Sequence, residues 1–173
     1  MLHTMVPFAA AMALLFAAAH DVAVRTVPNR VSLTVAAAGL VLNALDGQLV
    51  PALFGGGLVF AGAWYCWRRG WIGGGDVKLL TACVLLVPPG AVPELLLSTA
   101  IAGGILALCY VALARLLPEP GGRSLQRAGP ARHDNMVRRI WRVERRRIHR
   151  GQSLPYSCAI AAGMLLTLYV PLG

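Results

Sequence analysis

The amino-acid sequence predicts an all-α membrane protein, a bundle of about six transmembrane helices with both termini outside the cytoplasm. The chain has 173 residues, of which 57% are hydrophobic and only 13% charged, about half the charged share of a soluble domain. Its mean hydropathy of +0.65 excludes a disordered chain, because disorder requires low hydrophobicity. So few charges cannot cover a soluble globule. We therefore expect one membrane-embedded domain over residues 1–173.

Six apolar runs separated by polar turns are the expected spans. A signal peptide requires basic residues before its apolar run. No Lys or Arg precedes the first run here, so a retained helix is favoured over a signal peptide. Proline and glycine mark the turns between later runs. Several runs are shorter than the about 20 residues of a full span, so their limits are approximate. The runs cover residues 4–19, 31–45, 49–67, 79–87, 95–117 and 154–172.

The basic residues all fall on one side of this arrangement. The chain has 16 Lys and Arg against 7 Asp and Glu, a net charge of +9. When the loops after the first, third and fifth runs share one side, they collect every Lys and Arg, whereas the opposite turns hold Asp46 and Glu94. The positive-inside rule makes the basic side the cytoplasm. Both termini are therefore expected on the other side.

The longest loop, residues 118–152, is strongly basic, and we expect it to be cytoplasmic. Within it, residues 135–150 predict an amphipathic helix with Met136, Ile140 and Trp141 on its apolar face. Such a helix lies on the membrane surface and contacts anionic lipid headgroups. Nucleic-acid binding is the alternative raised by a pI near 10.5. A loop tethered between two spans favours lipid, so no nucleic-acid partner is expected.

Two acidic residues stand out because charge is scarce. Asp21 follows the first run and Asp76 precedes the fourth, so the topology places both at one cytoplasmic depth, where an acid is costly unless paired or functional. Two close carboxylates share a proton, which gives one acid and one base. Such a pair can activate a water against a peptide carbonyl and protonate the departing nitrogen.

No metal or cofactor is expected. The four cysteines lie far apart in or beside apolar runs, with no C-x-x-C pair. That distribution is typical of buried core residues rather than of a zinc or redox site.

Three glycines, Gly73, Gly74 and Gly75, come directly before Asp76. Three in a row disfavour a helix, so we expect a turn against which an extended substrate strand lies. The alternative is a glycine-rich loop with Asp76 as the N-cap of the next helix.

Three segments resemble motifs of the type IV prepilin peptidases, which are GxGD aspartic proteases. Residues 73–79 resemble the G-x-G-D motif and its D-x-K-L continuation. Residues 21–29 resemble the D-x-x-x-R-x-I-P-N segment that carries the first aspartate of that family. Residues 154–163 are similar to the P-Y-x-x-A-I-x-x-G start of its last helix. Ser157 and Cys158 depart from that pattern, since Gly or another small residue is expected after Tyr156.

The resemblance implies a six-span aspartic endopeptidase of the bacterial inner membrane, with its active site facing the cytoplasm. It implies Asp21 and Asp76 as the catalytic pair, and prepilin-like precursors as the partners whose leader peptide is removed. The chain lacks the paired, zinc-binding cysteines of the larger family members. It resembles the short, peptidase-only type associated with tight-adherence (Flp) pili, so methyl transfer is not expected.

Four residues near the two acids are candidates for binding substrate or shaping the site, together with the three glycines. Lys78 either influences the acid pair or contacts the precursor, although a lysine that snorkels to the interface is favoured. Arg25 either steadies Asp21 or binds lipid phosphate. Pro28 and Asn29 are expected to shape the turn before the second run.

Two other functions remain open. The first is a small proton- or cation-coupled transporter with Asp21 and Asp76 as ion sites. Against it, the sequence has no acid in the middle of a run and no inverted repeat. The second is a non-catalytic assembly partner of a pilus or secretion complex, which would tolerate the loss of either carboxylate.

Overall fold

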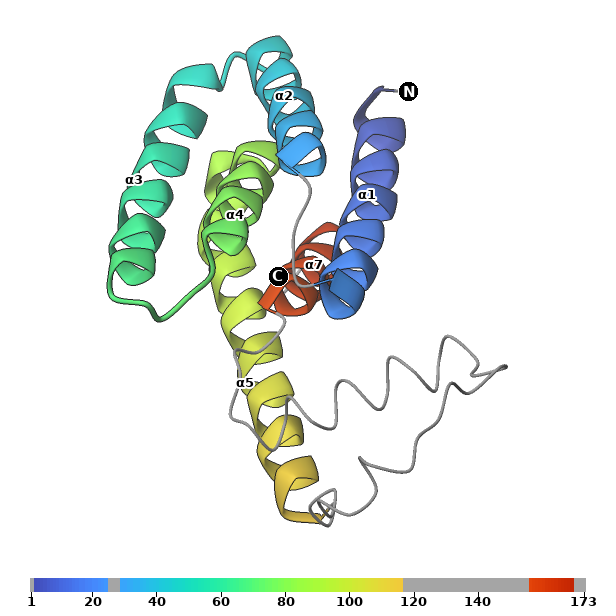
Figure 1. The fold of residues 1–173 in the computed structure, drawn as a ribbon. Helices are drawn as coiled ribbons and strands as arrows, with labels where there is room; N and C mark the ends of the chain where they lie inside the picture. Colours follow the sequence, from blue (N-terminus) through green and yellow to red (C-terminus); the bar gives the residue numbers. More distant parts are fainter. Residues whose placement is uncertain (1, 25–28, 117–155, 170–173) are drawn as a thin grey trace. The chain divides into compact units, whose positions relative to one another are not determined.

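The computed structural model describes residues 2–24, 29–116 and 156–169, and all the regular elements in these ranges are helical (Figure 1). The predicted all-α fold is therefore confirmed for them, whereas the basic loop 118–152 and its amphipathic helix lie outside the described residues. The elements are α1 (Leu2–Val24), α2 (Asn29–Leu45), α3 (Leu49–Arg68), α4 (Gly74–Leu86), the 3₁₀ turn η1 (Pro89–Ala91), α5 (Val92–Leu116) and α7 (Tyr156–Tyr169).

The chain forms two compact units. The first comprises residues 1–104 and 155–173, and it holds α1 to α4, the first part of α5 and α7. The second comprises residues 105–154, of which the structure describes the last part of α5. Both candidate acids lie in the first unit.

Two hydrogen bonds show that α2 and α4 run parallel. At their starts, Lys78 Nζ donates to Asn29 Oδ1 at 3.1 Å. Toward their ends, Asn43 Nδ2 donates to the Leu85 carbonyl oxygen at 3.0 Å. Parallel neighbours cannot be joined by a tight turn, and here α3 makes the return between them (Figure 1).

The Asn43 bond compensates for a proline. In a helix the Leu85 carbonyl would accept from the N–H four residues later, but that residue is Pro89, which has none. Asn43 is only 4% exposed, and its amide supplies the missing donor. One turn earlier, a Cβ on Gly39 would lie 2.5 Å from Leu86 Cα. Glycine is therefore required where the backbones of α2 and α4 approach.

The helices α2 and α3 end in the same way, at a glycine with positive φ. These are Gly47 (φ 69°) and Gly70 (φ 75°). In both, the N–H after the glycine bonds back to the helix in a Schellman motif, from Gln48 to the Asn43 carbonyl at 2.7 Å and from Trp71 to the Cys66 carbonyl at 3.0 Å. The turn expected at residues 46–48 is thus confirmed.

The helix α4 is enclosed by α2, α3 and α7, which all pack against it (Figure 1). It has only 13 residues, or about 20 Å of helix, against about 30 Å for the hydrocarbon core of a bilayer. Its buried residues lie on several sides of the helix, which is expected for a helix surrounded by others. They are Val77, Leu79, Ala82, Cys83, Val84 and Leu86.

Two helices are long and apolar enough to cross a membrane by length and composition, namely residues 49–68 and 89–113. Three other apolar helices are shorter, at residues 8–21, 29–45 and 156–169. The outer side of α3 is apolar, because Val50 and Phe54 are 78% and 75% exposed. An exposed apolar surface of this kind marks a contact with a membrane or with another protein. The number of spans and the side of the termini stay predictions.

Candidate active site

Asp21 is a buried carboxylate. The helix α1 continues past the predicted end of the first run to Val24, so Asp21 lies in its last turn. The residue is 7% exposed, and a carboxylate in such a position requires a hydrogen-bond partner. Ser157, fully buried on α7, supplies it, since its Oγ donates to Asp21 Oδ2 at 2.5 Å.

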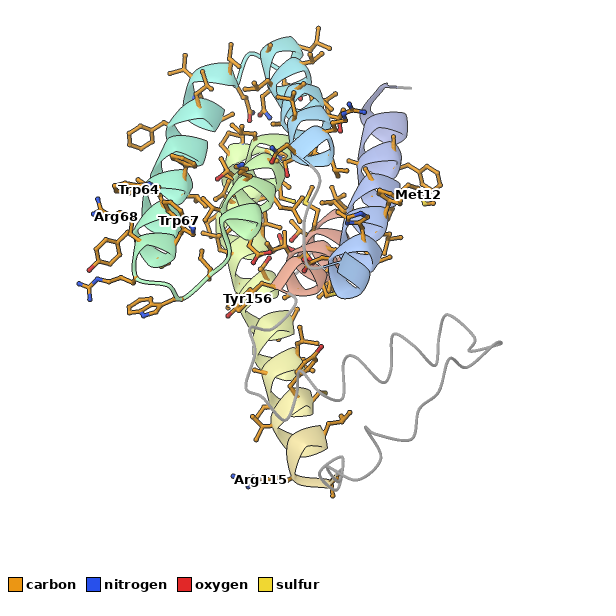
Figure 2. The ribbon with its side chains drawn as sticks, in the orientation of Figure 1. Met12, Trp64, Trp67, Arg68, Arg115 and Tyr156 are labelled. Atoms are coloured by element: carbon orange, nitrogen blue, oxygen red, sulfur yellow. The ribbon has the colours of Figure 1, made fainter. Side chains whose placement is uncertain are left out.

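The start of α7 meets the end of α1. Ser157 is the second residue of α7, and Tyr156 marks the start of that helix in Figure 2. The next residue, Cys158, places its Sγ 3.9 Å from the Ala18 carbonyl oxygen of α1. The two helices are therefore antiparallel at this contact. The first turn of a helix carries partial positive charge, which favours an anion beside it, and the Asp21 carboxylate occupies that place.

Asp76 lies in the first turn of α4, where the helix dipole also favours a negative charge. It is partly buried. Gly73 is the N-cap of α4, with extended backbone angles (φ −75°, ψ 147°). A Cβ on Gly73 would lie 2.9 Å from Asp76 Oδ2. The Asp76 carboxylate therefore turns back toward the glycine that precedes the helix.

The prediction that the three glycines form a non-helical turn is wrong for two of them. Gly74 and Gly75 are the first residues of α4, and Gly73 alone is outside it. Glycine is accepted at an N-cap, and the backbone N–H groups of Asp76 and Val77 both bond to the Gly73 carbonyl, at 3.1 and 3.3 Å. The alternative, with Asp76 as the cap, is also wrong, because Asp76 is inside the helix.

The end of α3 lies beside the start of α4. A Cβ on Gly74 would be 3.2 Å from Trp67 Nε1, so the indole packs closely over the first turn of α4. In Figure 2, Arg68 extends outward from α3, and its guanidinium lies 5.2 Å from the Trp64 ring centroid. Aromatic and basic side chains together at a helix end are typical of a membrane interface.

Of the four other candidate residues, the structure brings two into contact, and the other two lie outside the described residues. Lys78 and Asn29 are both exposed, and their hydrogen bond ties the starts of α4 and α2. The sequence singled out both residues but not their pairing. Arg25 and Pro28 lie outside the described residues.

The helix α7 contacts both helices that carry an acid, since it packs against α1 and α4 (Figure 1). In chemical terms, α1 and α4 each carry a carboxylate at one end, and a serine hydroxyl of α7 bonds to the carboxylate of α1. Within the described ranges there is no group of three or more His, Cys, Asp or Glu residues placed to hold a metal ion.

Ser157 is the residue that sequence reasoning did not assign to the site. In the sequence, Ser157 is only a departure from the expected motif, and its bond joins positions 136 residues apart. The available signal is a hydroxyl in the first turn of a mostly apolar helix.

The comparisons with known proteins identify a family. The model of the type IV leader peptidase family matches residues 8–108, a range that includes most of α1, all of α2 to α4 and both acids but ends before α7. No curated protein and no solved structure matches the chain.

Proposed function

Because the chain belongs to the type IV leader peptidase family, a family of membrane-embedded peptidases, we propose that it is an aspartic endopeptidase with Asp21 and Asp76 as its catalytic pair. Its substrates are then pilin-like precursors of the tight-adherence (Flp) type. Cleavage removes their leader peptide at the cytoplasmic face of the bacterial inner membrane.

The observation that carries this proposal is the buried Asp21, whose carboxylate is held by a hydroxyl from a distant helix. An acid 7% exposed among apolar helices is costly unless it is paired or functional. Asp76 also lies at a helix end, and α7 contacts both acid-bearing helices.

The chemistry requires one carboxylate ionised and the other protonated. The ionised group takes a proton from a water, which attacks the carbonyl carbon of the scissile peptide bond. The protonated group then donates its proton to the departing nitrogen as the carbon–nitrogen bond breaks. Two carboxylates that share one proton supply both roles without a metal.

Co-expression of the protein with an epitope-tagged Flp-type prepilin tests this catalytic pair. Loss of the leader peptide is measured as a shift of the prepilin band on a gel. Asp21→Asn and Asp76→Asn should each lower cleavage by about 100-fold or more, the usual contribution of general acid–base catalysis. Asp46→Asn is the matched control, because Asp46 lies in the turn after α2. That variant should process the precursor like the wild type.

Retained cleavage in either catalytic variant, with normal amounts of inserted protein, would contradict the pair. A non-catalytic assembly partner would leave the precursor uncut even in the wild type. A transporter would show an ion flux that depends on the two acids without any cleavage.

A further inference from the structure

The Ser157 hydroxyl is placed to control the Asp21 carboxylate. Ser157 is 0% exposed, and the 2.5 Å distance from its Oγ to Asp21 Oδ2 lies at the short end of the range for a hydroxyl bonded to a charged oxygen. Because both side chains are buried, bulk water does not compete for this bond.

The contact belongs to a larger junction between α1 and α7. Cys158 Sγ and the Ala18 carbonyl meet one turn away, at 3.9 Å, and Ala18 is itself buried. Two contacts from successive α7 residues fix the rotation of α7 against α1. The Ser157 hydroxyl is therefore held by the fold and does not depend on a flexible side chain.

We propose that Ser157 is a positioning residue for the aspartic chemistry, and this inference rests on the proposed function. By bonding to Oδ2, the hydroxyl fixes the plane of the Asp21 carboxylate and leaves Oδ1 to receive the proton of the attacking water. Ser157 itself does not touch the substrate. Its position lies outside the range of the family match, residues 8–108, and in the segment where the sequence departs from the motif.

The test measures cleavage of a purified Flp-type prepilin by the full-length protein in detergent micelles. Ser157→Ala should lower kcat about 10-fold, because a hydrogen bond to a charged group is worth about one factor of ten or more, and KM should stay within about twofold. Ser157→Thr keeps the hydroxyl and should restore most of kcat. Ser157→Cys keeps the packing but offers a weak donor, so it should resemble Ser157→Ala.

Ser32→Ala is the matched control. Ser32 is also buried, at 6% exposure, but its Oγ makes no hydrogen bond in the structure. Its removal should leave kcat unchanged. Ser157→Ala also takes a hydrogen-bond partner from a buried carboxylate and should lower the melting temperature, so kcat is compared per folded molecule. A role in packing alone would lower stability and leave kcat per folded molecule intact.

A wild-type kcat in Ser157→Ala or in Ser157→Cys would overturn the positioning role, and so would an equal loss in Ser32→Ala. A different pattern signals failure of the proposed function, namely a wild type that leaves the prepilin uncut or an Asp21→Asn variant that still cleaves it. If Ser157→Thr does not fold because the site is full, the comparison of Ser157→Cys with Ser32→Ala decides.

Discussion

Gly73 has no side chain where one would meet the Asp76 carboxylate. The distance of 2.9 Å from an added Cβ to Asp76 Oδ2 is shorter than a van der Waals contact. The backbone of Gly73 is nevertheless extended, at φ −75° and ψ 147°, which any residue adopts. Glycine is therefore needed here for the space beside the acid and not for its conformational freedom.

The substitution Gly73→Ala should accordingly turn the Asp76 carboxylate away while leaving the fold intact. We expect cleavage of the prepilin to fall about 10-fold or more, since small misplacements of a catalytic group cost up to about 100-fold. The melting temperature in detergent should change little. The rate of prepilin cleavage and a thermal melt of the same preparation check both expectations.

Gly57→Ala is the control for Gly73→Ala. Gly57 lies inside α3, and an added Cβ there meets nothing within 4 Å. Its cleavage rate should match the wild type. Equal activity of the two alanine variants would contradict a role for Gly73 in seating Asp76.

Among the elements, α2 and α4 make the central parallel pair, and Asn43 is its key side chain. The amide bonds to Gly39 O at 3.1 Å on its own helix and to Leu85 O at 3.0 Å on α4. An unsatisfied carbonyl in an apolar surrounding is costly, and Pro89 creates one at Leu85. A single polar residue of α2 therefore permits α4 to end at a double proline without such a defect.

The substitution Asn43→Leu should destabilise the protein by about 1–3 kcal/mol, the cost of leaving a buried polar group unsatisfied. Unfolding by a denaturing detergent, followed by circular dichroism, measures the change. Thr34→Ala is the control, because the Thr34 hydroxyl bonds to Val31 O of its own helix at an exposed position. A loss for Asn43→Leu no larger than for Thr34→Ala would contradict this account.

The helices were predictable from the sequence because apolar runs and glycine turns are local signals. The prediction was wrong at Gly74 and Gly75. Their low helix propensity is outweighed by the packing of α4, which holds its first turn in helical form. The Asn43–Leu85 and Ser157–Asp21 bonds were not predicted. Each bond depends on which helices become neighbours, and the hydropathy pattern of the sequence does not specify which helices pack together.

At the scale of the whole molecule, the proposed chemistry requires that the helix ends carrying Asp21 and Asp76 lie on the same side of the membrane. The turns at residues 46–48 and 69–73 lie at opposite ends of α3. Because α3 is long and apolar enough to cross a membrane, we predict that these two turns lie on opposite sides of it. The charge distribution predicts the 69–73 turn on the cytoplasmic side.

Alkaline phosphatase, which is active only outside the cytoplasm, can report this sidedness when it is fused to the chain. A fusion after Gly47 and a fusion at the C-terminus should both be active, because both points are expected outside. A fusion after Gly70 should be inactive. Equal activity at Gly47 and Gly70 would show that α3 does not span the membrane, and an inactive C-terminal fusion would refute the even number of spans.

The long separation of Asp21 and Ser157 has a consequence for the order of events during synthesis. Their 136-residue separation, at about 5–20 residues per second, means that Ser157 is made roughly 7–27 s after Asp21. Until then the acid has no access to its hydroxyl partner, even when all the earlier helices have been inserted. The contact between Asp21 and Ser157 is therefore completed only after α7 has been synthesised and docks against α1.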